Sequence, residues 1–366
     1  MATSAQLASP LNTTNSFVRR QIIYYVLAMQ AAALTLMAGI AAVANWSTAA
    51  HWYIQAQILF IALALLAWQL IQNENLLAPL KSLGLANWAS LLRSVLIIFC
   101  GGFIGLAALP DALRWMPGIL YTVAVILDGV DGWLARRFKQ ETVLGARLDT
   151  CFDAFGLLVA PIVACWLGAL HPSYLLVSAA YYVFQCALQW RRRRGLICHA
   201  LPASKSRRIW AGLQMILVAI ALLPMFTAQF TSHLGFAFML PLLAGFLRDW
   251  YVVAGINSGR SVNRILKNWP SVYPLVLLAL RGLVVVSIIY GFSNLNHNGV
   301  FQLIIGIMGL LVLIGCASRS AAGTVLLILA AFTASSSIPL SAAQLILLYS
   351  AAGVVLLGSG PLSLWR

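Results

Sequence analysis

Carboxylates gather in one short stretch of a chain that otherwise avoids them. The sequence holds eight acidic residues among 366, and five of them lie between residues 128 and 153. Asp128 and Asp131 are three residues apart, and Asp149 and Asp153 are four residues apart. On a helix, either spacing places two side chains on the same face, about one turn apart. Two facing helices would therefore bring four carboxylates to one point.

Four carboxylates at one point require a cation between them, because like charges at short range disfavour each other's ionisation. Ligand sets made of oxygen alone suit hard divalent ions such as Mg²⁺, Mn²⁺ or Ca²⁺. Two such ions would balance the four charges, and a dinuclear site can hold a diphosphate and stabilise both the attacking and the leaving oxygen. The stretch therefore predicts a metal-assisted phosphoryl-transfer site. The alternative is four polar residues that cap two membrane helices without a common role.

These residues resemble the signature of the CDP-alcohol phosphatidyltransferase family, Asp-x2-Asp-Gly-x2-Ala-Arg-x8-Gly-x3-Asp-x3-Asp. Every fixed position is present at its expected spacing: Asp128, Asp131, Gly132, Ala135, Arg136, Gly145, Asp149 and Asp153. The resemblance covers residues 87–255 and implies a core of six membrane helices. It also implies that a phosphatidyl-type group passes from a CDP-linked lipid to an alcohol acceptor, with release of CMP, in phospholipid biosynthesis.

The resemblance assigns roles to the acidic residues. It implies that Asp128, Asp131 and Asp149 bind two divalent cations, Mg²⁺ or Mn²⁺. Asp153 would lie near the same ions as a fourth ligand, and it is the usual candidate for the catalytic base that takes the proton of the acceptor hydroxyl. The sequence alone does not assign the base, since two metals would lower the pKa of a neighbouring carboxyl group, whereas three other carboxylates would raise it.

Five further residues are candidates for binding the nucleotide or its phosphates. Gly132 and Ala135 are small, so a nucleotide could approach their helix closely, and Gly145 would lie nearby. Arg136 could bind phosphate oxygens through its guanidinium fork, or it could be an ordinary interfacial cation. Gly145 could equally be a plain turn glycine. Lys205 belongs to a segment, 201–214, that resembles the start of the family's fifth helix, and a solvated basic loop explains it as well.

The composition excludes an ordinary soluble domain. Mean hydropathy is +0.91, with 62% hydrophobic and 8% charged residues. Apolar runs of about 17 to 24 residues are long enough to cross a bilayer, and helices satisfy the backbone there. We therefore expect an all-α polytopic membrane protein with about twelve transmembrane helices. The expected spans cover roughly 21–44, 53–72, 87–109, 115–135, a span from 145, 173–190, 209–227, 234–255, 272–292, 300–316, 321–333 and 340–357. The span at 87–109 opens with an Asn and Arg pair, Asn87 and Arg93, as in the family's first helix.

The net charge of +15 does not indicate nucleic-acid binding, because the cations fall in short clusters between apolar runs. This is the positive-inside pattern, and the same clusters would attract anionic membrane lipids. It predicts that both termini and the Asp cluster face the cytoplasm, in an integral protein of the cell membrane. A cleaved signal peptide ending near residue 44 is the competing interpretation of the first run, which is long for that purpose.

We expect three regions: residues 1–86 with two extra helices, the transferase core at 87–258, and a four-helix domain at 259–366. The last region faintly resembles the DoxX-type four-helix membrane family. Arg248 and Asp249 form an ionisable pair within a span, which indicates either a functional site or an Arg248 that snorkels to the interface while Asp249 pairs with it. The six cysteines show no metal or disulfide spacing. A membrane transporter with an intramembrane carboxylate site is the alternative function, and the family resemblance suggests a homodimer.

Overall fold

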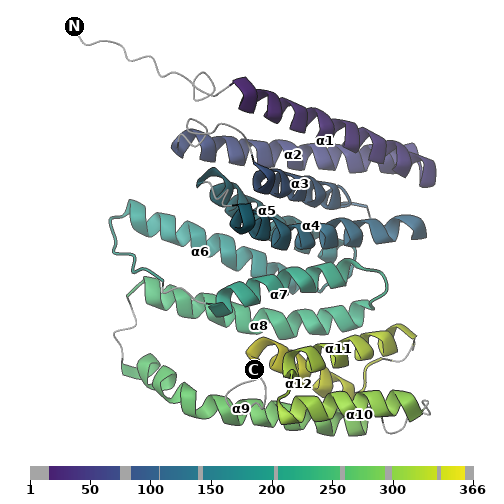
Figure 1. The fold of residues 1–366 in the computed structure, drawn as a ribbon, viewed down its shortest axis with the longest axis vertical. Coiled ribbons are helices and arrows are strands. Elements are labelled where there is room, and N and C mark those ends of the chain that lie inside the picture. Colours follow the sequence, from purple (N-terminus) through teal and green to yellow (C-terminus); the bar gives the residue numbers. More distant parts are fainter. Residues whose placement is uncertain are drawn as a thin grey trace. The chain divides into compact units, whose positions relative to one another are not determined.

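The computed structural model describes residues 16–74, 84–106, 108–138, 143–201, 205–255, 260–292, 299–335 and 339–358. These residues form an all-helical structure (Figure 1). Its twelve α-helices are α1 (Ser16–Val43), α2 (Trp46–Glu74), α3 (Leu85–Gly101), α4 (Asp111–Phe138), α5 (Val143–Trp166), α6 (Leu175–Arg193), α7 (Lys205–Leu222), α8 (Ala228–Val253), α9 (Arg260–Phe292), α10 (Gly299–Ile314), α11 (Ser318–Ser335) and α12 (Ala342–Leu357), with one short 3₁₀ helix at Pro172–Tyr174. The expected number of helices is confirmed.

The number of membrane crossings is not confirmed. Within the described residues, seven helices are long and apolar enough to cross a membrane, and four more apolar helices are shorter than 18 residues. One of the shorter apolar segments is Asn87–Gly101, on the helix that was expected to run to residue 109. Several apolar helices of this length indicate an integral membrane protein, because the bilayer core leaves backbone groups no partner except one another.

The chain forms two compact units. The first comprises residues 1–168 and 218–224, and the second comprises residues 169–217 and 225–366. Six helices, α3 to α8, lie within the stretch expected to form the transferase core. The division between the units falls inside that stretch and crosses α7 near its C-terminal end. The three predicted regions stay a prediction.

Helix α3 is the centre of the first unit. It packs against α2, α4 and α5, while α1 pairs with α2. Residues on several sides of α3 are buried, including Ile97, Ile98, Phe99 and Cys100. A helix that is buried on several sides belongs in the interior of a bundle. The helix that carries the Asn87 and Arg93 pair is therefore the core of its unit.

In the second unit, α9 to α12 form a closed ring of four helices. Helix α9 packs on α10, α10 on α11, α11 on α12, and α12 back on α9, while α8 also packs on α12. Helix α12 begins with a capping box formed by Ser341 and Gln344, which satisfies two backbone donors at its first turn. Arg281 of α9 is 2% exposed, so this bundle encloses a cation.

One helix boundary differs from the expected spans. The cations and Pro270 between the spans 234–255 and 272–292 indicated a basic loop over 257–270, whereas α9 begins at Arg260 and continues through Pro270. Glu141, which lies between the two Asp pairs, is outside the described residues, as are both chain ends and most of the segment 73–86 between the second and third expected spans.

Candidate metal centre

The N-terminal half of α3 holds an unusual set of buried polar side chains. Asn87, Ser90, Arg93 and Ser94 are exposed by 5%, 6%, 1% and 1%. These four residues lie within eight positions of one another on a helix whose other half is apolar. A buried polar group is costly unless it has partners, and a buried charge is costlier still. The arginine must therefore meet anionic groups on the neighbouring helices.

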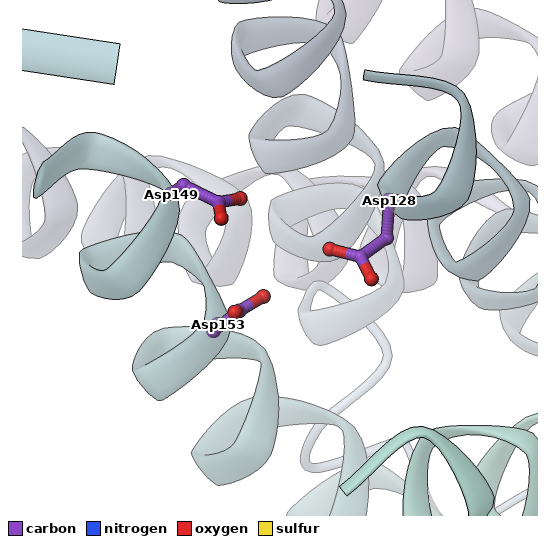
Figure 2. Close-up of side chains that lie close together, drawn as sticks. All are labelled: Asp128, Asp149 and Asp153. Atoms are coloured by element: carbon purple, nitrogen blue, oxygen red, sulfur yellow. The ribbon is translucent and has the colours of Figure 1, made fainter. Parts of the chain in front are cut away.

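Three of the predicted metal ligands meet at one place. Asp149 and Asp153 lie one turn apart on α5, and Asp128 faces them from α4 (Figure 2). One carboxylate oxygen from each of the three lies within 4.8 Å of the other two. The side chains of Asp128, Asp149 and Asp153 are 34%, 44% and 47% exposed. Asp149 and Asp153 share one face of α5, as their spacing predicted, and Asp128 of α4 faces them.

The buried arginine of α3 lies among these carboxylates. Its Nη2 is 2.7 Å from Oδ1 of Asp149 and its Nη1 is 3.2 Å from Oδ1 of Asp153. Nη1 also forms an ion pair with Asp128. Arg93 thus links α3 to both α4 and α5, and it supplies part of the cationic charge that converging carboxylates require. The sequence placed Arg93 on the family's first helix and did not predict this role.

The three carboxylates fit a divalent cation. Two ligands on opposite sides of an ion bound at about 2.1 to 2.4 Å are about 4.2 to 4.8 Å apart, and the three carboxylate oxygens lie within 4.8 Å of one another, so a single ion could contact all three. All the donors are oxygens, and each is open to solvent in part. Three aspartates and one arginine carry a net formal charge of about −2, which one divalent ion balances.

The remaining signature residues are placed only in part. Asp131, Ala135 and Arg136 belong to the last turns of α4, and Lys205 is the first residue of α7. Their side chains lie outside the described residues, so their predicted roles stay predictions. Lys205 also belongs to the second unit rather than to the first.

The two signature glycines lie one turn away from the carboxylates. Gly132 follows Asp128 by four residues on α4, and Gly145 precedes Asp149 by four residues on α5. Both are partly exposed. Gly145 lies in the first turn of its helix and not in a separate turn, which disfavours the turn-glycine alternative. At both positions, the absence of a side chain leaves the helix backbone accessible beside the acidic cluster.

The Arg248–Asp249 pair belongs to a separate cluster in the second unit. Asp249 accepts from Arg248 Nη2 at 3.1 Å and from Arg207 Nη1 at 3.1 Å. These three residues line a cavity of about 350 Å³ between α7 and α8, together with Trp210 and Pro241. Asp249 therefore neutralises Arg248 as one alternative expected, and it also pairs with a second arginine that the sequence did not connect to it.

Gln214, the last residue of the segment 201–214 that resembles the start of the family's fifth helix, makes buried hydrogen bonds between helices. It is 2% exposed, and its Nε2 donates to the carbonyl of Phe238 at 2.9 Å. The hydroxyl of Tyr174 also bonds to it. Gln214 therefore ties α7 to α8 and to the short 3₁₀ helix.

Comparison with known proteins agrees with this geometry. Residues 83–248 match the family model described as CDP-alcohol phosphatidyltransferase. A CDP-diacylglycerol–glycerol-3-phosphate 3-phosphatidyltransferase of Pseudomonas fluorescens is 30% identical over 188 residues, which are 48% of this chain and 90% of the relative. The chain belongs to the CDP-alcohol phosphatidyltransferase family. It is a phosphatidyltransferase-family enzyme, and this membership favours an enzyme over the transporter alternative.

Other relatives match shorter parts. A protein of the same name from Sodalis glossinidius is 34% identical over 101 residues, 27% of this chain, so the chain spans about half (52%) of that relative's length. A CDP-diacylglycerol–inositol 3-phosphatidyltransferase of Schizosaccharomyces pombe is 34% identical over 68 residues, 18% of this chain and 27% of the relative. No solved structure matches the chain. The family match ends before α9, and the DoxX resemblance of residues 259–366 stays a prediction.

Proposed function

We propose that this protein transfers a phosphatidyl group from CDP-diacylglycerol to an alcohol and releases CMP. The acceptor hydroxyl would form a new bond to the phosphorus attached to diacylglycerol. The bond from that phosphorus to the oxygen of CMP would break, with its electron pair leaving on CMP. The observation that carries the proposal is the convergence of Asp128, Asp149 and Asp153 around Arg93.

The names of the relatives support the donor and rank the acceptors. All three relatives described above are named for CDP-diacylglycerol, two with glycerol 3-phosphate and one with inositol. Glycerol 3-phosphate is our first candidate for the acceptor because the P. fluorescens alignment covers nine-tenths of that relative. Inositol is the second candidate.

The metal-binding part of the proposal follows from the ligand set. Asp128, Asp149 and Asp153 would hold the ions, with Asp131 as the fourth ligand, and Mg²⁺ or Mn²⁺ suits oxygen donors. Two bound divalent ions would supply positive charge to the diphosphate and to the departing CMP. Counting four aspartates, Arg93 and two such ions gives a net formal charge of about +1, which complements an anionic diphosphate.

Asp153 is our candidate for the base. Its contact with Arg93, at 3.2 Å, is longer than the 2.7 Å contact of Asp149, and it is the most exposed of the three carboxylates. A carboxylate that is less tightly held by a cation accepts a proton more readily. Arg93, by contrast, is buried and fixed between α4 and α5, so it orients the carboxylates and leaves the proton transfer to Asp153.

The setting of the reaction is part of the same proposal. The chain would lie in the cell membrane with up to twelve crossings, with the Asp cluster open to the cytoplasm, where CDP-linked substrates and free Mg²⁺ occur. The arginine-rich end of α6, Arg191 to Arg193, supports this orientation through the positive-inside rule. Gly132, Ala135, Arg136, Gly145 and Lys205 would contact the nucleotide or the phosphates. A homodimer is proposed by family resemblance alone.

The test is CMP release by the purified protein from CDP-diacylglycerol with Mg²⁺ or Mn²⁺, in the presence of glycerol 3-phosphate, inositol or serine. We expect release that requires both a divalent ion and one acceptor. Asp149→Asn and Asp153→Asn should each lower kcat by at least about a hundredfold, because a positioned base or charge contributes about that factor or more.

Asp111→Asn is the matched control, since the Asp111 side chain is 94% exposed and pairs with Arg114 at 3.3 Å. It should retain wild-type turnover. Thermal unfolding in detergent verifies that each variant is folded. Near-normal turnover in Asp149→Asn or Asp153→Asn contradicts the role of that residue, and no CMP release by the wild type with any acceptor contradicts the proposed reaction.

A further inference from the structure

Two helices outside the family match pack against the helix that carries Arg93. The family match begins at residue 83, whereas α1 and α2 end at Val43 and Glu74. Helices α1 and α2 pair with each other, and α2 packs on α3 and α5. The hairpin formed by α1 and α2 therefore belongs to the same unit as the acidic cluster, and its contacts with α3 include polar ones.

The first polar contact is next to Arg93 in sequence. The hydroxyl of Tyr25 in α1 is 3.0 Å from Oγ of Ser94 and 3.4 Å from the carbonyl of Leu91. Ser94 donates its own proton to the carbonyl of Leu91 at 2.7 Å. Either hydroxyl can be the donor between Tyr25 and Ser94, and both lie within hydrogen-bond distance of the same carbonyl. The Tyr25 ring also meets Trp88 edge-on, with centroids 6.4 Å apart.

Two more contacts follow along α3 and the turn after it. Nε1 of Trp52 donates to the carbonyl of Phe99 at 3.0 Å, and Trp52 is fully buried. Nε2 of His51 is 3.0 Å from the carbonyl of Ile104. The hairpin thus contacts α3 in its N-terminal half, near its end and just beyond it. These contacts restrain both the position of α3 along its own axis and its rotation about that axis.

Helix α3 requires such a restraint because its own length does not fix its depth. Its apolar part, Asn87–Gly101, is about 22 Å long at 1.5 Å per residue, which is shorter than a bilayer core of about 30 Å. A shift of about 1.5 Å along the axis corresponds to one residue and exceeds the tolerance of an ion pair. Arg93 reaches its carboxylates at 2.7 and 3.2 Å, so such a shift would change which oxygens it holds.

We propose that the α1–α2 hairpin is a positioning element for the acidic cluster, and that Tyr25 is a positioning residue that acts through Ser94 and Arg93. This inference rests on the proposed function. The hairpin holds α3 at the depth from which Arg93 orients Asp128, Asp149 and Asp153. Tyr25 itself touches neither substrate nor carboxylate.

The test is a double-mutant cycle on CMP release by the full-length protein. Tyr25→Phe removes one hydrogen bond of about 0.5 to 1.5 kcal/mol, and we expect kcat to fall about two- to tenfold with the KM for CDP-diacylglycerol unchanged. In an Arg93→Lys background, which already loses the two-pronged contact, the same substitution should change kcat less than about twofold. Equal fold-changes in both backgrounds contradict the proposal, since a merely structural role is additive.

Tyr24→Phe is the matched control, because Tyr24 is the neighbouring residue and is 64% exposed. It should leave kcat unchanged. The same cycle measured on thermal midpoints in detergent does not depend on turnover, so it serves where Arg93→Lys is inactive: additive midpoints contradict the proposal, and non-additive midpoints support it. A wild type that releases no CMP contradicts the proposed function instead, which separates the two failures.

Discussion

At the scale of the residue, one arginine sets the charge balance of the site. Arg93 is 1% exposed and contacts three carboxylates that are each about one-third to one-half exposed. Its guanidinium offers the flat fork that suits several carboxylate oxygens at once. A divalent ion bound by these aspartates would share the same oxygens with Arg93. The arginine and the metal should therefore partly replace each other in holding α4 and α5 together.

This relation predicts the behaviour of Arg93→Gln. Removal of the cation leaves oxygens of three carboxylates within 4.8 Å of one another, so in EDTA the variant should be less stable by about 2 kcal/mol. This is less than the roughly 3 to 5 kcal/mol for breaking a fully buried pair, because the carboxylates are partly hydrated. Millimolar Mg²⁺ should raise its thermal midpoint more than that of the wild type. The measurement is thermal unfolding in detergent with and without Mg²⁺.

The control for this experiment is Arg114→Gln. Arg114 pairs with Asp111 at 3.3 Å, and its side chain is 61% exposed. An exposed pair contributes at most about 1 kcal/mol, so this variant should resemble the wild type in both buffers. An Arg93→Gln variant that gains no more from Mg²⁺ than the wild type does would contradict the shared role of arginine and metal.

Which residues converge could be predicted from the sequence only in part. The spacing of Asp149 and Asp153 fixes a common helix face, because helix periodicity is local. The contact of both with Asp128 depends on how α4 packs on α3 and α5, and family resemblance rather than periodicity anticipated it. Arg93 lies more than 30 residues from any of the three, and nothing in its local sequence indicates which helix face will meet theirs.

At the scale of the element, close backbone packing joins the hairpin to α3. A Cβ added to Gly102 would lie 2.5 Å from Nε1 of Trp52, and one added to Gly101 would lie 2.2 Å from Leu59. These two glycines end α3 eight residues earlier than the apolar run indicated. The chain then turns through Gly105, whose φ is +90°, a value that favours glycine. An apolar run shows how far a helix can extend. The glycine pair, by contrast, shows where the neighbouring helix α2 packs closely against α3.

Gly102→Ala should therefore separate α2 from α3. Gly102 has an ordinary helical φ of −56°, so the cost arises from the clash with a rigid indole and not from backbone strain. Overpacking of this kind costs about 1 to 3 kcal/mol. We expect a lower thermal midpoint and a lower kcat, since Trp52 restrains the helix that carries Arg93. Unfolding curves and CMP release measure the two effects.

Gly39→Ala provides the comparison within the same unit. Gly39 lies inside α1, and a Cβ added there meets nothing within 4 Å. Alanine in a helix interior is favoured over glycine by about 0.5 to 1 kcal/mol, so this variant should be as stable as the wild type or more so. Equal stability of the Gly102→Ala and Gly39→Ala variants would show that the contact between α2 and α3 accommodates the added methyl group without loss of stability.

The ends of helices could be predicted from the sequence where an apolar run stops, and less well where a polar segment continues the helix. The predicted span 272–292 matches the C-terminal end of α9, but the helix starts at Arg260 and contains Pro270. Cations and a proline indicated a loop there. A proline removes one backbone hydrogen bond and can bend a helix without ending it, so the cationic segment continues the helix.

At the scale of the whole molecule, charge is distributed very unevenly between regions. All eight acidic side chains lie at or before Asp249, so the helices α9 to α12 contain none. Arg281 is nevertheless buried within this bundle. The Tyr273 hydroxyl, near the middle of α9, donates to the carbonyl of Leu357 at the end of α12, at 2.6 Å. The two helices are antiparallel, since Gly291 near the end of α9 also lies beside Gln344 near the start of α12, and Arg319 approaches Gly358 just after α12.

The positive-inside pattern makes a prediction about the path of the whole chain through the membrane. On the proposed path of twelve crossings with a cytoplasmic N-terminus, the segment after α6 would be cytoplasmic, and the N-terminal end of α10 would be on the opposite side. Cys198 lies after the cationic end of α6 and is partly exposed. In a chain whose other cysteines are replaced by serine, Cys198 should react with a membrane-impermeant maleimide only in inverted vesicles. The variant Asn296→Cys, in the same background without Cys198, should react only in right-side-out vesicles.

Labelling of both cysteines from one side would show that an even number of the helices α7, α8 and α9 crosses the membrane, and would contradict the twelve-crossing path. Labelling of Cys198 from outside would place the arginine-rich end of α6 on the wrong side of the membrane for cytoplasmic CDP-linked substrates.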